Sequence, residues 1–119
     1  MAQKFKASYD LEGDVLTLYR ENTQVKESLE VAEDLIIDLD KNQKMISLEL
    51  LDAYKFLHTL NERITKKMLQ EVEEVEVEVK NYRNYLIITL FFKYNNQVIA
   101  EKLPAFSSTD FTSPLLVSA

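Results

Sequence analysis

The sequence predicts an α+β domain rich in antiparallel β-structure. Over most of the chain, apolar and polar residues alternate in short segments between turn-forming residues, which is typical of strands with one buried face. Residues 52–71 instead carry apolar side chains at helical spacing. The length of 119 residues, with 46% hydrophobic and 29% charged, fits one globular domain. We therefore expect a single domain over residues 1–119, with two β-hairpins (5–51), one amphipathic helix (52–71), a three-stranded meander (72–104) and a tail (105–119).

The first hairpin is predicted for residues 5–19, where two alternating segments flank a turn. A two-residue loop at Glu12-Gly13 pairs Tyr9 with Leu16, so that apolar side chains meet on one face. Gly13, the single glycine of the chain, is expected to supply the positive φ of this turn. The polar, weakly patterned residues 21–33 are interpreted as a connection.

The second hairpin is predicted from two further alternating segments. A loop centred between Asn42 and Gln43 places their apolar residues opposite one another: Leu35 with Leu50, Ile37 with Leu48 and Leu39 with Ile46. A slip by one residue would place every apolar side chain on the wrong face. Asn42 tolerates a left-handed backbone conformation, so we expect it to form the turn.

A helix is expected directly after the second hairpin. Asp52 stands at the position of an N-cap. An apolar stripe follows at helical spacing, which predicts a helix that covers one face of a sheet: Ala53, Leu57, Leu60, Ile64 and Met68. A break near Asn61, which would cap a second helical segment, is left open.

The last predicted unit is a meander of three strands joined by two tight turns. Turns at residues 82–83 and 95–96 bring apolar residues together on one core face: Val77 with Ile88 and Phe92 with Ile99. The opposite face has large apolar side chains in the middle and charges at its rims, a pattern that commonly marks an interface. We expect these residues to form a binding surface: Tyr85, Ile87, Phe91 and Val98 as anchors, and Glu74, Glu76 and Glu78 at the rim. The alternative is that the helix or the N-terminal hairpins cover this face.

Composition excludes several classes of function. Zero cysteines remove disulfides and thiolate chemistry, and fit a reducing, cytoplasmic location. A single glycine excludes phosphate-binding glycine loops. A net charge of −6 argues against nucleic acid as a partner, and no apolar run approaches the roughly 20 residues that span a bilayer. We also expect no signal peptide and no cofactor.

One acidic cluster is a candidate for metal-dependent chemistry. Asp38 and Asp40 lie two residues apart, and the predicted register adds Glu49 on the same face. Hard cations such as magnesium prefer oxygen ligands of this kind, and a metal-dependent hydrolase or nuclease uses them. Acidic strand faces near turns also serve solubility and block edge pairing, so we do not assign a metal site. His58, the only histidine, is interpreted as a helix-surface residue.

Residues 7–57 resemble a small prokaryotic family known as domain of unknown function 2283. The resemblance is carried by the stretches "YDLEGDVLTL", "VAEDLIIDLDKNQKMISLELLDA" and "AYKFL". The usual glycine of the family's second turn is replaced here by Lys41-Asn42-Gln43-Lys44, and the strands from Val72 onward extend beyond the short family core. The resemblance implies no catalytic residues. It implies, by association only, an antitoxin-like binding role.

From these observations we expect a small non-enzymatic interaction module. It would form a homodimer, or bind a basic protein partner, through the outer face of the meander. Two alternatives stay open at this point. One is the metal-dependent hydrolase using Asp38, Asp40 and Glu49, and the other is a purely structural homo-oligomer.

Overall fold

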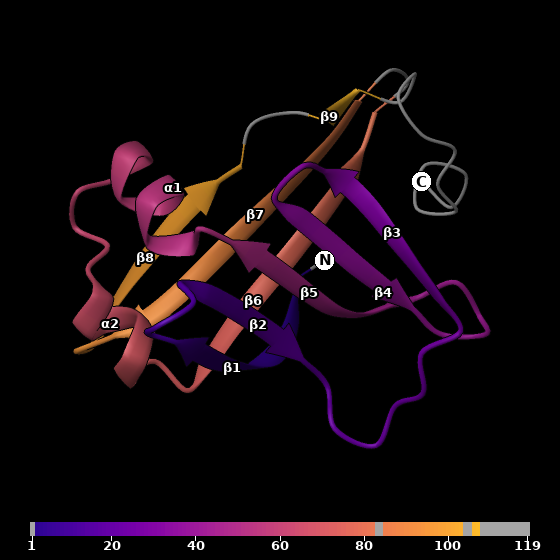
Figure 1. Ribbon diagram of the computed structural model, residues 1–119, viewed down its shortest axis with the longest axis horizontal. Coiled ribbons are helices and arrows are strands. Elements are labelled where there is room, and N and C mark those ends of the chain that lie inside the picture. The colour runs from indigo at the N-terminus through magenta and orange to yellow at the C-terminus, as the bar shows by residue number, and fades with distance from the viewer. Residues whose placement is uncertain (1, 83–84, 104–105, 108–119) are drawn as a thin grey trace.

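The fold was established from a computed structural model, which describes residues 2–82, 85–103 and 106–107. It is α+β and rich in antiparallel strands, as predicted (Figure 1). The elements in chain order are β1 (Gln3–Asp10), β2 (Val15–Tyr19), β3 (Glu27–Ala32), β4 (Leu35–Leu39), β5 (Met45–Leu51), α1 (Ala53–Leu60), α2 (Lys66–Glu71), β6 (Glu74–Asn81), β7 (Tyr85–Tyr94), β8 (Gln97–Lys102) and β9 (Phe106–Ser107). No helix among these described elements is long and apolar enough to cross a membrane.

The nine described strands belong to one sheet rather than to separate hairpins and a meander. The strand order is β3-β4-β5-β2-β1-β6-β7-β8, and β9 pairs with β7 beside this path. Strand β1 makes the connection, because its residues Lys6–Asp10 pair with β2 and its residues Gln3–Lys6 pair with β6. The N-terminal hairpins and the C-terminal strands are therefore hydrogen-bonded to each other, which the sequence pattern did not predict.

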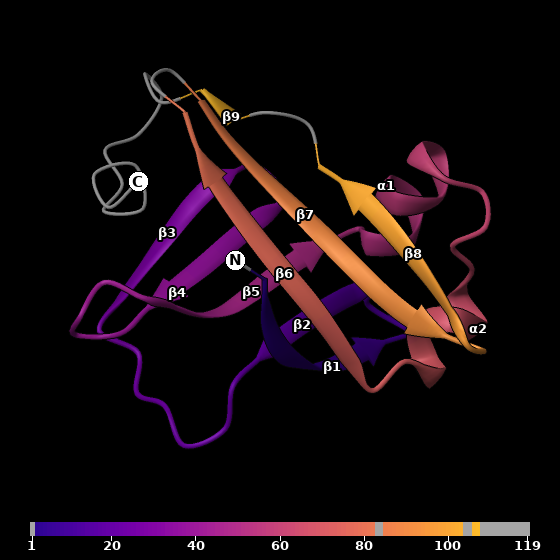
Figure 2. The same cartoon turned by 180° about the vertical axis from the view of Figure 1, so that it is seen from behind.

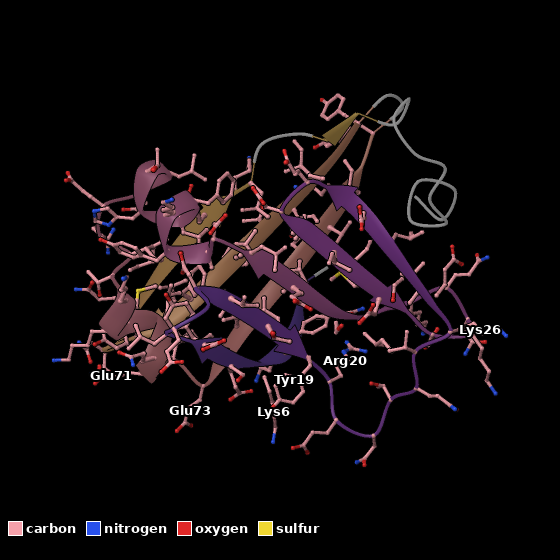
Figure 3. The ribbon with its side chains drawn as sticks, viewed as in Figure 1. Lys6, Tyr19, Arg20, Lys26, Glu71 and Glu73 are labelled. Carbon is pink, nitrogen blue, oxygen red and sulfur yellow. The ribbon has the colours of Figure 1, made fainter. Side chains whose placement is uncertain are left out.

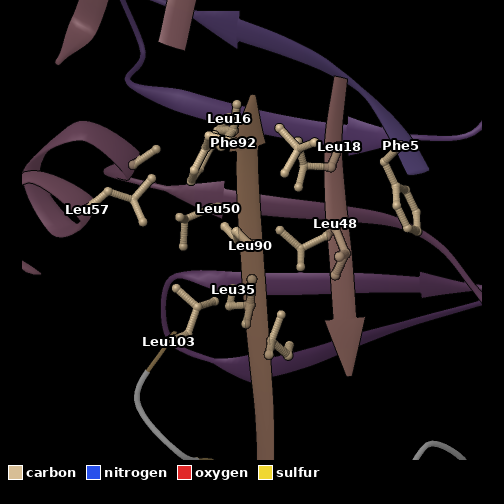
Figure 4. Close-up of a cluster of buried hydrophobic side chains, with 14 of the residues drawn as sticks. Phe5, Leu16, Leu18, Leu35, Leu48, Leu50, Leu57, Leu90, Phe92 and Leu103 are labelled. Atoms are coloured by element: carbon tan, nitrogen blue, oxygen red, sulfur yellow. The ribbon is translucent and has the colours of Figure 1, made fainter. Parts of the chain in front are cut away.

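The sheet folds over on itself, so that β1–β5 lie across β6–β8 and the core fills the space between (Figures 1 and 2). Figure 4 shows β7 running across the direction of β4 and β5, with Leu48, Leu50, Leu90 and Phe92 between the layers. Leu48, Leu90 and Phe92 have no exposed surface. Alternation along each strand sends every second side chain into this core.

The helical region consists of two short helices, not the single helix predicted for residues 52–71. Helix α1 ends at Leu60, and the chain turns at Asn61, whose side-chain Oδ1 accepts a hydrogen bond from Arg63 N at 3.0 Å. The turn buries Ile64 completely, and Thr65 then caps α2 by accepting a hydrogen bond from Met68 N at 3.1 Å. The first helix thus ends at the break near Asn61 that the sequence allows.

Strand β3 lies where a connection was expected over residues 21–33. It is an edge strand that pairs only with β4 among the described residues, with Leu29 opposite Ile37. Only Val31 of this strand is buried, while Ser28 and Glu30 face outward. Because an edge strand buries little, its sequence carries a weak alternation signal, and this explains why the prediction was wrong.

The pairing of the two N-terminal hairpins agrees with the sequence pattern, apart from one bulge. Tyr9 lies opposite Leu16 and Leu35 opposite Leu50. A register shift between Asp38 and Leu39 places Leu39 opposite Met45, so the predicted Leu39–Ile46 pair is wrong. A bulge adds one residue to one strand, and the residues that precede it keep their places on the core face or the outward face. The alternation of apolar and polar residues therefore does not reveal the bulge.

Two turn residues also differ from the prediction. The positive φ of the first turn belongs to Asp14 (54°) rather than to Gly13, and that of the second turn belongs to Gln43 (63°) rather than to Asn42. Asp52, expected as the N-cap of α1, has a left-handed backbone (φ 50°) and makes no side-chain cap.

In the C-terminal strands, β7 and β8 pair as predicted, and β6 and β7 do not. Phe92 lies opposite Ile99, and the turn between them has positive φ at Asn95 (49°) and Asn96 (61°). Val77, however, lies opposite Leu90 instead of Ile88, a shift of two residues. A shift of two keeps the same side chains on the core face, so alternation does not distinguish the two registers. The predicted tail of residues 105–119 is described only at β9, and the rest lies outside the described residues.

Candidate interaction surface

The predicted interface residues lie on the face of β6–β8 that points away from the core. We call this the meander face, and it comprises the outward side chains of the three strands: Glu74, Glu76, Glu78 and Lys80 of β6, Tyr85, Ile87, Thr89, Phe91 and Lys93 of β7, and Val98, Ala100 and Lys102 of β8. Their strand neighbours Leu86, Ile88, Leu90 and Phe92 fill the core. In Figure 2, no described helix or strand lies across the meander face, and α1 instead directs Leu57 into the core (Figure 4).

The apolar strip on β7 is partly shielded by its neighbours on the same sheet. Phe91 lies between Glu76 on β6 and Ala100 on β8, and it is half-buried, as is Ile87. The exposure is greatest at the two ends, where Tyr85 is 39% and Val98 is 57% exposed. Apolar side chains thus lie along β7 on either side of Thr89, which is itself buried, and the meander face is most exposed at Tyr85 and at Val98 of β8.

The acidic rim on β6 is partly neutralised within the chain. Lys93 Nζ lies 3.0 Å from Glu76 Oε1, and Lys80 Nζ lies 3.7 Å from Glu78 Oε1. Both lysines are more than half exposed, so these pairs are screened by solvent and contribute little to stability. Two of the three predicted rim carboxylates therefore have an intrachain cation that a partner's charge would have to replace or share.

Sequence reasoning missed one aromatic contact beside this face. The rings of Tyr82 and Tyr85 stack with centroids 4.7 Å apart and planes inclined by 16°, and Tyr82 is 42% exposed. Tyr82 N donates a hydrogen bond to Tyr85 O at 2.8 Å across the β6–β7 turn, which sets the two rings side by side. The sequence does place Tyr82 and Tyr85 three residues apart around the β6–β7 turn. The predicted register of β6 and β7 is wrong by two residues, however, and does not bring the two rings together.

The opposite layer presents a polar outward face, in contrast to the meander face. Strand pairing places Ser28, Asp38, Ser47, Tyr19 and Lys6 in one row across β3, β4, β5, β2 and β1. Lys6 and Tyr19, labelled in Figure 3, lie next to each other at the β1–β2 end of this row. Lys6 Nζ also lies 2.8 Å from Glu21 Oε1. The two layers share a core but differ in what they show to solvent.

The candidate metal ligands are engaged in hydrogen bonds of the fold. The two carboxylate oxygens of Asp38 accept hydrogen bonds from Ser28 Oγ and Ser47 Oγ, each at 2.6 Å. Asp40 Oδ1 accepts from the backbone N of Asn42 and Lys44 and closes the β4–β5 turn. These backbone hydrogen bonds, the one from Lys44 foremost, lower the pKa of Asp40.

Glu49, the third candidate, lies between Thr17 and Ile36 on the neighbouring strands. Within the described part of the chain, no three histidine, cysteine or acidic side chains gather as a metal site would require. His58 sits on α1, where its ring stacks on Tyr54 and its Nδ1 lies 2.8 Å from Ile64 O, so it bridges the helix to the turn that follows.

Asp14 has a role that sequence reasoning missed. It lies in the β1–β2 turn, and its Oδ1 accepts hydrogen bonds from Tyr9 Oη and from Tyr54 N, both at 2.7 Å. Its backbone carbonyl accepts from Ala53 N at 2.9 Å. The N-terminus of α1 is therefore capped from another element instead of by Asp52.

The same contacts shift two pKa values in opposite directions. Partial burial acts to raise the pKa of Asp14, but hydrogen bonds from Tyr9 and from the backbone of Tyr54 and Lys55 outweigh it, and the net pKa is lowered. Burial, followed by the hydrogen bond to Asp14, raises the pKa of Tyr9. Both pKa shifts favour the same state, in which the neutral phenol of Tyr9 donates a hydrogen bond to the ionised carboxylate of Asp14.

This Tyr9–Asp14 arrangement lies in the first of the stretches that carry the family resemblance. Residues 6–53 match the family Protein of unknown function (DUF2283). The match confirms the expected resemblance and covers what becomes β2–β5, most of β1 and the first residue of α1. Tyr9, Asp14 and Asp38 therefore belong to the DUF2283 segment, whereas the meander face lies outside it.

One curated relative extends the comparison. The chain is 31% identical over 67 residues to the archaeal "Uncharacterized protein MJ0789" of Methanocaldococcus jannaschii. The matched region is 56% of this chain and 57% of that relative, so the chain spans little more than half of the relative's length. No solved structure matches the chain significantly. That relative is itself described as uncharacterized.

A separate apolar pocket of about 240 Å³ lies between the β3–β4 turn, β5, α1 and the end of β8. Its lining combines apolar side chains with two acidic residues of the turn: Ala32, Leu35, Leu50, Phe56 and Leu103, with Glu33 and Asp34.

Proposed function

We propose that this protein is a small cytoplasmic, non-enzymatic interaction module that binds another protein chain through the meander face. The observation that supports the proposal is the apolar strip along β7, which points away from the core and lies under no described element of the chain. Burying such a strip against a partner releases roughly 25 cal/mol per Å² of apolar surface. The polar outward face of β1–β5 offers no comparable strip.

The chemistry of the surface defines the kind of partner. Phe91, with Tyr85 and Ile87 on the same strand, supplies aromatic and aliphatic anchors of the type that dominate binding energy at interfaces. The charged residues at the rim, which act through solvent, set orientation and specificity more than affinity. A second copy of the chain fits this surface, and so does a basic protein in an antitoxin-like complex.

The contacts of the three candidate metal ligands do not favour the hydrolase alternative. Asp38 and Asp40 use their carboxylate oxygens to hold neighbouring strands and a turn. Glu49, the third residue of that hypothesis, lies one strand further along with a threonine and an isoleucine as its strand partners. These contacts give the acidic residues a structural role that needs no metal ion.

The experiment that tests the proposal compares two lysine substitutions of half-buried outward residues. Phe91→Lys introduces a charge in the middle of the meander face, next to Glu76, where the fold tolerates a cation. Ile36→Lys is the matched control, because Ile36 faces outward from β4 between Glu30 and Glu49. Circular dichroism first establishes that both variants are folded.

Light scattering over a concentration series then gives the mass. If the partner is a second copy, wild type and Ile36→Lys approach twice 13.9 kDa at high concentration and Phe91→Lys stays at the monomer mass. If the partner is another protein, affinity capture from the source cells retains it with Ile36→Lys and loses it with Phe91→Lys. A wild type that stays monomeric and captures the same proteins as Phe91→Lys refutes the proposal.

A further inference from the structure

We infer that the partner is a second copy of this chain, packed face to face on the meander face with the two-fold axis running along β7. The inference rests on the proposed function and adds the identity and the orientation of the partner. Charge is distributed unevenly across β6, β7 and β8, with carboxylates on β6 and a lysine at the end of β8. Two copies related by a two-fold axis present the same surface to each other, so the surface must be complementary to itself.

Strand pairing arranges the meander face in rows that cross the sheet. One row contains Glu78, Thr89 and Lys102, because Thr89 pairs with both of the other residues. The neighbouring row contains Glu76, Phe91 and Ala100. The apolar strip of β7 is thus bordered by carboxylates on the β6 side and by small or cationic residues on the β8 side.

A two-fold axis along β7 brings one pair of opposite charges together, while Glu76 faces the small side chain of Ala100. The rotation exchanges left and right, so β6 of one copy lies over β8 of the other, while each residue of β7 faces its own counterpart. Glu78 then faces Lys102 of the second copy, and the symmetry forms this pair twice. Phe91 faces Phe91 in the middle, and Thr89, which is only 8% exposed in the single chain, lies beneath this contact.

The other face-to-face arrangement has its axis across the strands, and charge disfavours it. That axis places β6 over β6 of the second copy, so Glu74, Glu76 and Glu78 face one another. Like charges directly opposite are destabilising, and a mispaired orientation of this kind is what interface charges select against. Lys93, which faces itself in the favoured arrangement, is already paired with Glu76 and is 54% exposed.

The size of the surface predicts a weak dimer. Three strands about 4.8 Å apart and about 27 Å long cover roughly 400 Å² per copy. A standard stable interface buries about 800 Å² per partner. We therefore expect association that depends on dilution, and measurements must extend to high protein concentration.

A charge exchange tests the orientation. Glu78→Lys and Lys102→Glu each place two pairs of like charges in the dimer, and each is expected to weaken association on the order of five- to tenfold. The double variant, with both substitutions, restores the wild-type dissociation constant measured by sedimentation equilibrium. If the axis instead crosses the strands, Glu78→Lys relieves repulsion and strengthens association, and the double variant shows no rescue.

Cross-linking gives an independent readout, because the chain has no native cysteine. Packed sheets lie about 10 Å apart, which exceeds the reach of a disulfide but suits a short bismaleimide. Lys93→Cys, at an exposed position of β7 that faces its own counterpart, is expected to give a cross-linked dimer and Glu76→Cys is not. The reverse yield contradicts the orientation.

The outcomes separate the two proposals. A wild type that dimerises and loses the dimer on Phe91→Lys, yet shows no charge rescue and no Lys93→Cys cross-link, overturns the orientation and leaves the interaction surface standing. A wild type that is monomeric at every concentration overturns the second copy as the partner. In that case capture of a different protein, lost on Phe91→Lys, would still support the interaction module.

Discussion

At the scale of single residues, Asp14 connects the first hairpin to the first helix. Its carboxylate accepts hydrogen bonds from Tyr9 Oη and Tyr54 N, and its backbone carbonyl accepts from Ala53 N. We expect Asp14→Ala to lower the free energy of unfolding by about 1–2 kcal/mol, because it removes a helix cap and leaves a part-buried phenol without its acceptor. Tyr9→Phe should cost less, since the cap remains. Urea unfolding of both variants measures the difference, and equal losses would contradict the assignment.

The lowered pKa of Asp14 predicts a direction for pH dependence. A carboxyl group whose pKa is lower in the folded state than in the unfolded state contributes stability above its unfolded pKa. That contribution is lost as the pH falls through the folded pKa, which lies below the ordinary aspartate pKa of 3.8. The difference in stability between wild type and Asp14→Asn should therefore shrink as the pH is lowered from 7 toward 3. A difference that is constant over this range would show that Asp14 does not act through its charge.

Residue-scale prediction from the sequence was limited by turn geometry. Gly13, Asn42 and Asp52 are residue types that favour turns or caps, yet Asp14 and Gln43 carry the positive φ angles and Asp14 supplies the cap. Residue preference identifies where a turn lies but not which position within it is left-handed. A cap that comes from a distant element leaves no signal in the helix's own sequence.

At the scale of elements, the break between α1 and α2 is stabilised by local hydrogen bonds. Thr65 Oγ1 accepts from Met68 N at 3.1 Å at the start of α2, which has only six residues. A helix this short depends on its cap and its packing, because nucleation is costly. We expect Thr65→Ala to lower the free energy of unfolding by about 1 kcal/mol and Thr65→Ser to have little effect. Thermal unfolding tests this, and identical losses for both variants would show that the methyl group matters instead of the hydroxyl.

The pattern of apolar residues predicted the strands inside the sheet and the edge strand β8, but it missed β3 at the opposite edge. Strands β2 and β5 have alternating buried positions and were placed correctly, whereas β3 was interpreted as a connection. Alternation also fixed which side chains face the core in β6 and β7 but not their register, which differs by two residues. The outward position of Tyr85, Ile87, Phe91 and Val98 was therefore predictable, while the contact between Tyr82 and Tyr85 was not.

At the scale of the whole molecule, β1 holds the two layers together. Lys6 of β1 pairs with Tyr19 on one side and Glu74 on the other, so the strand passes from one layer into the next. Phe5 beside it is 2% exposed, and Arg20 lies over its ring at 5.2 Å. A sequence pattern reports which face of a strand is buried but not which distant strand lies beside it, and this is why separate hairpins and a meander were expected.

The DUF2283 segment depends on the C-terminal strands β6 and β7, which lie over its apolar face. Residues 6–53 form one layer, and its inward side chains Leu16, Leu18, Leu48 and Leu50 are buried largely by β6 and β7 (Figure 4). A fragment of residues 1–72 would expose this face, because the strands that cover it are removed. We expect such a fragment to be unfolded or self-associated, with exposed apolar surface that binds a hydrophobic dye. The full chain is the control, with cooperative unfolding and little dye binding. A monomeric fragment that unfolds cooperatively would show instead that the first layer is stable without its cover.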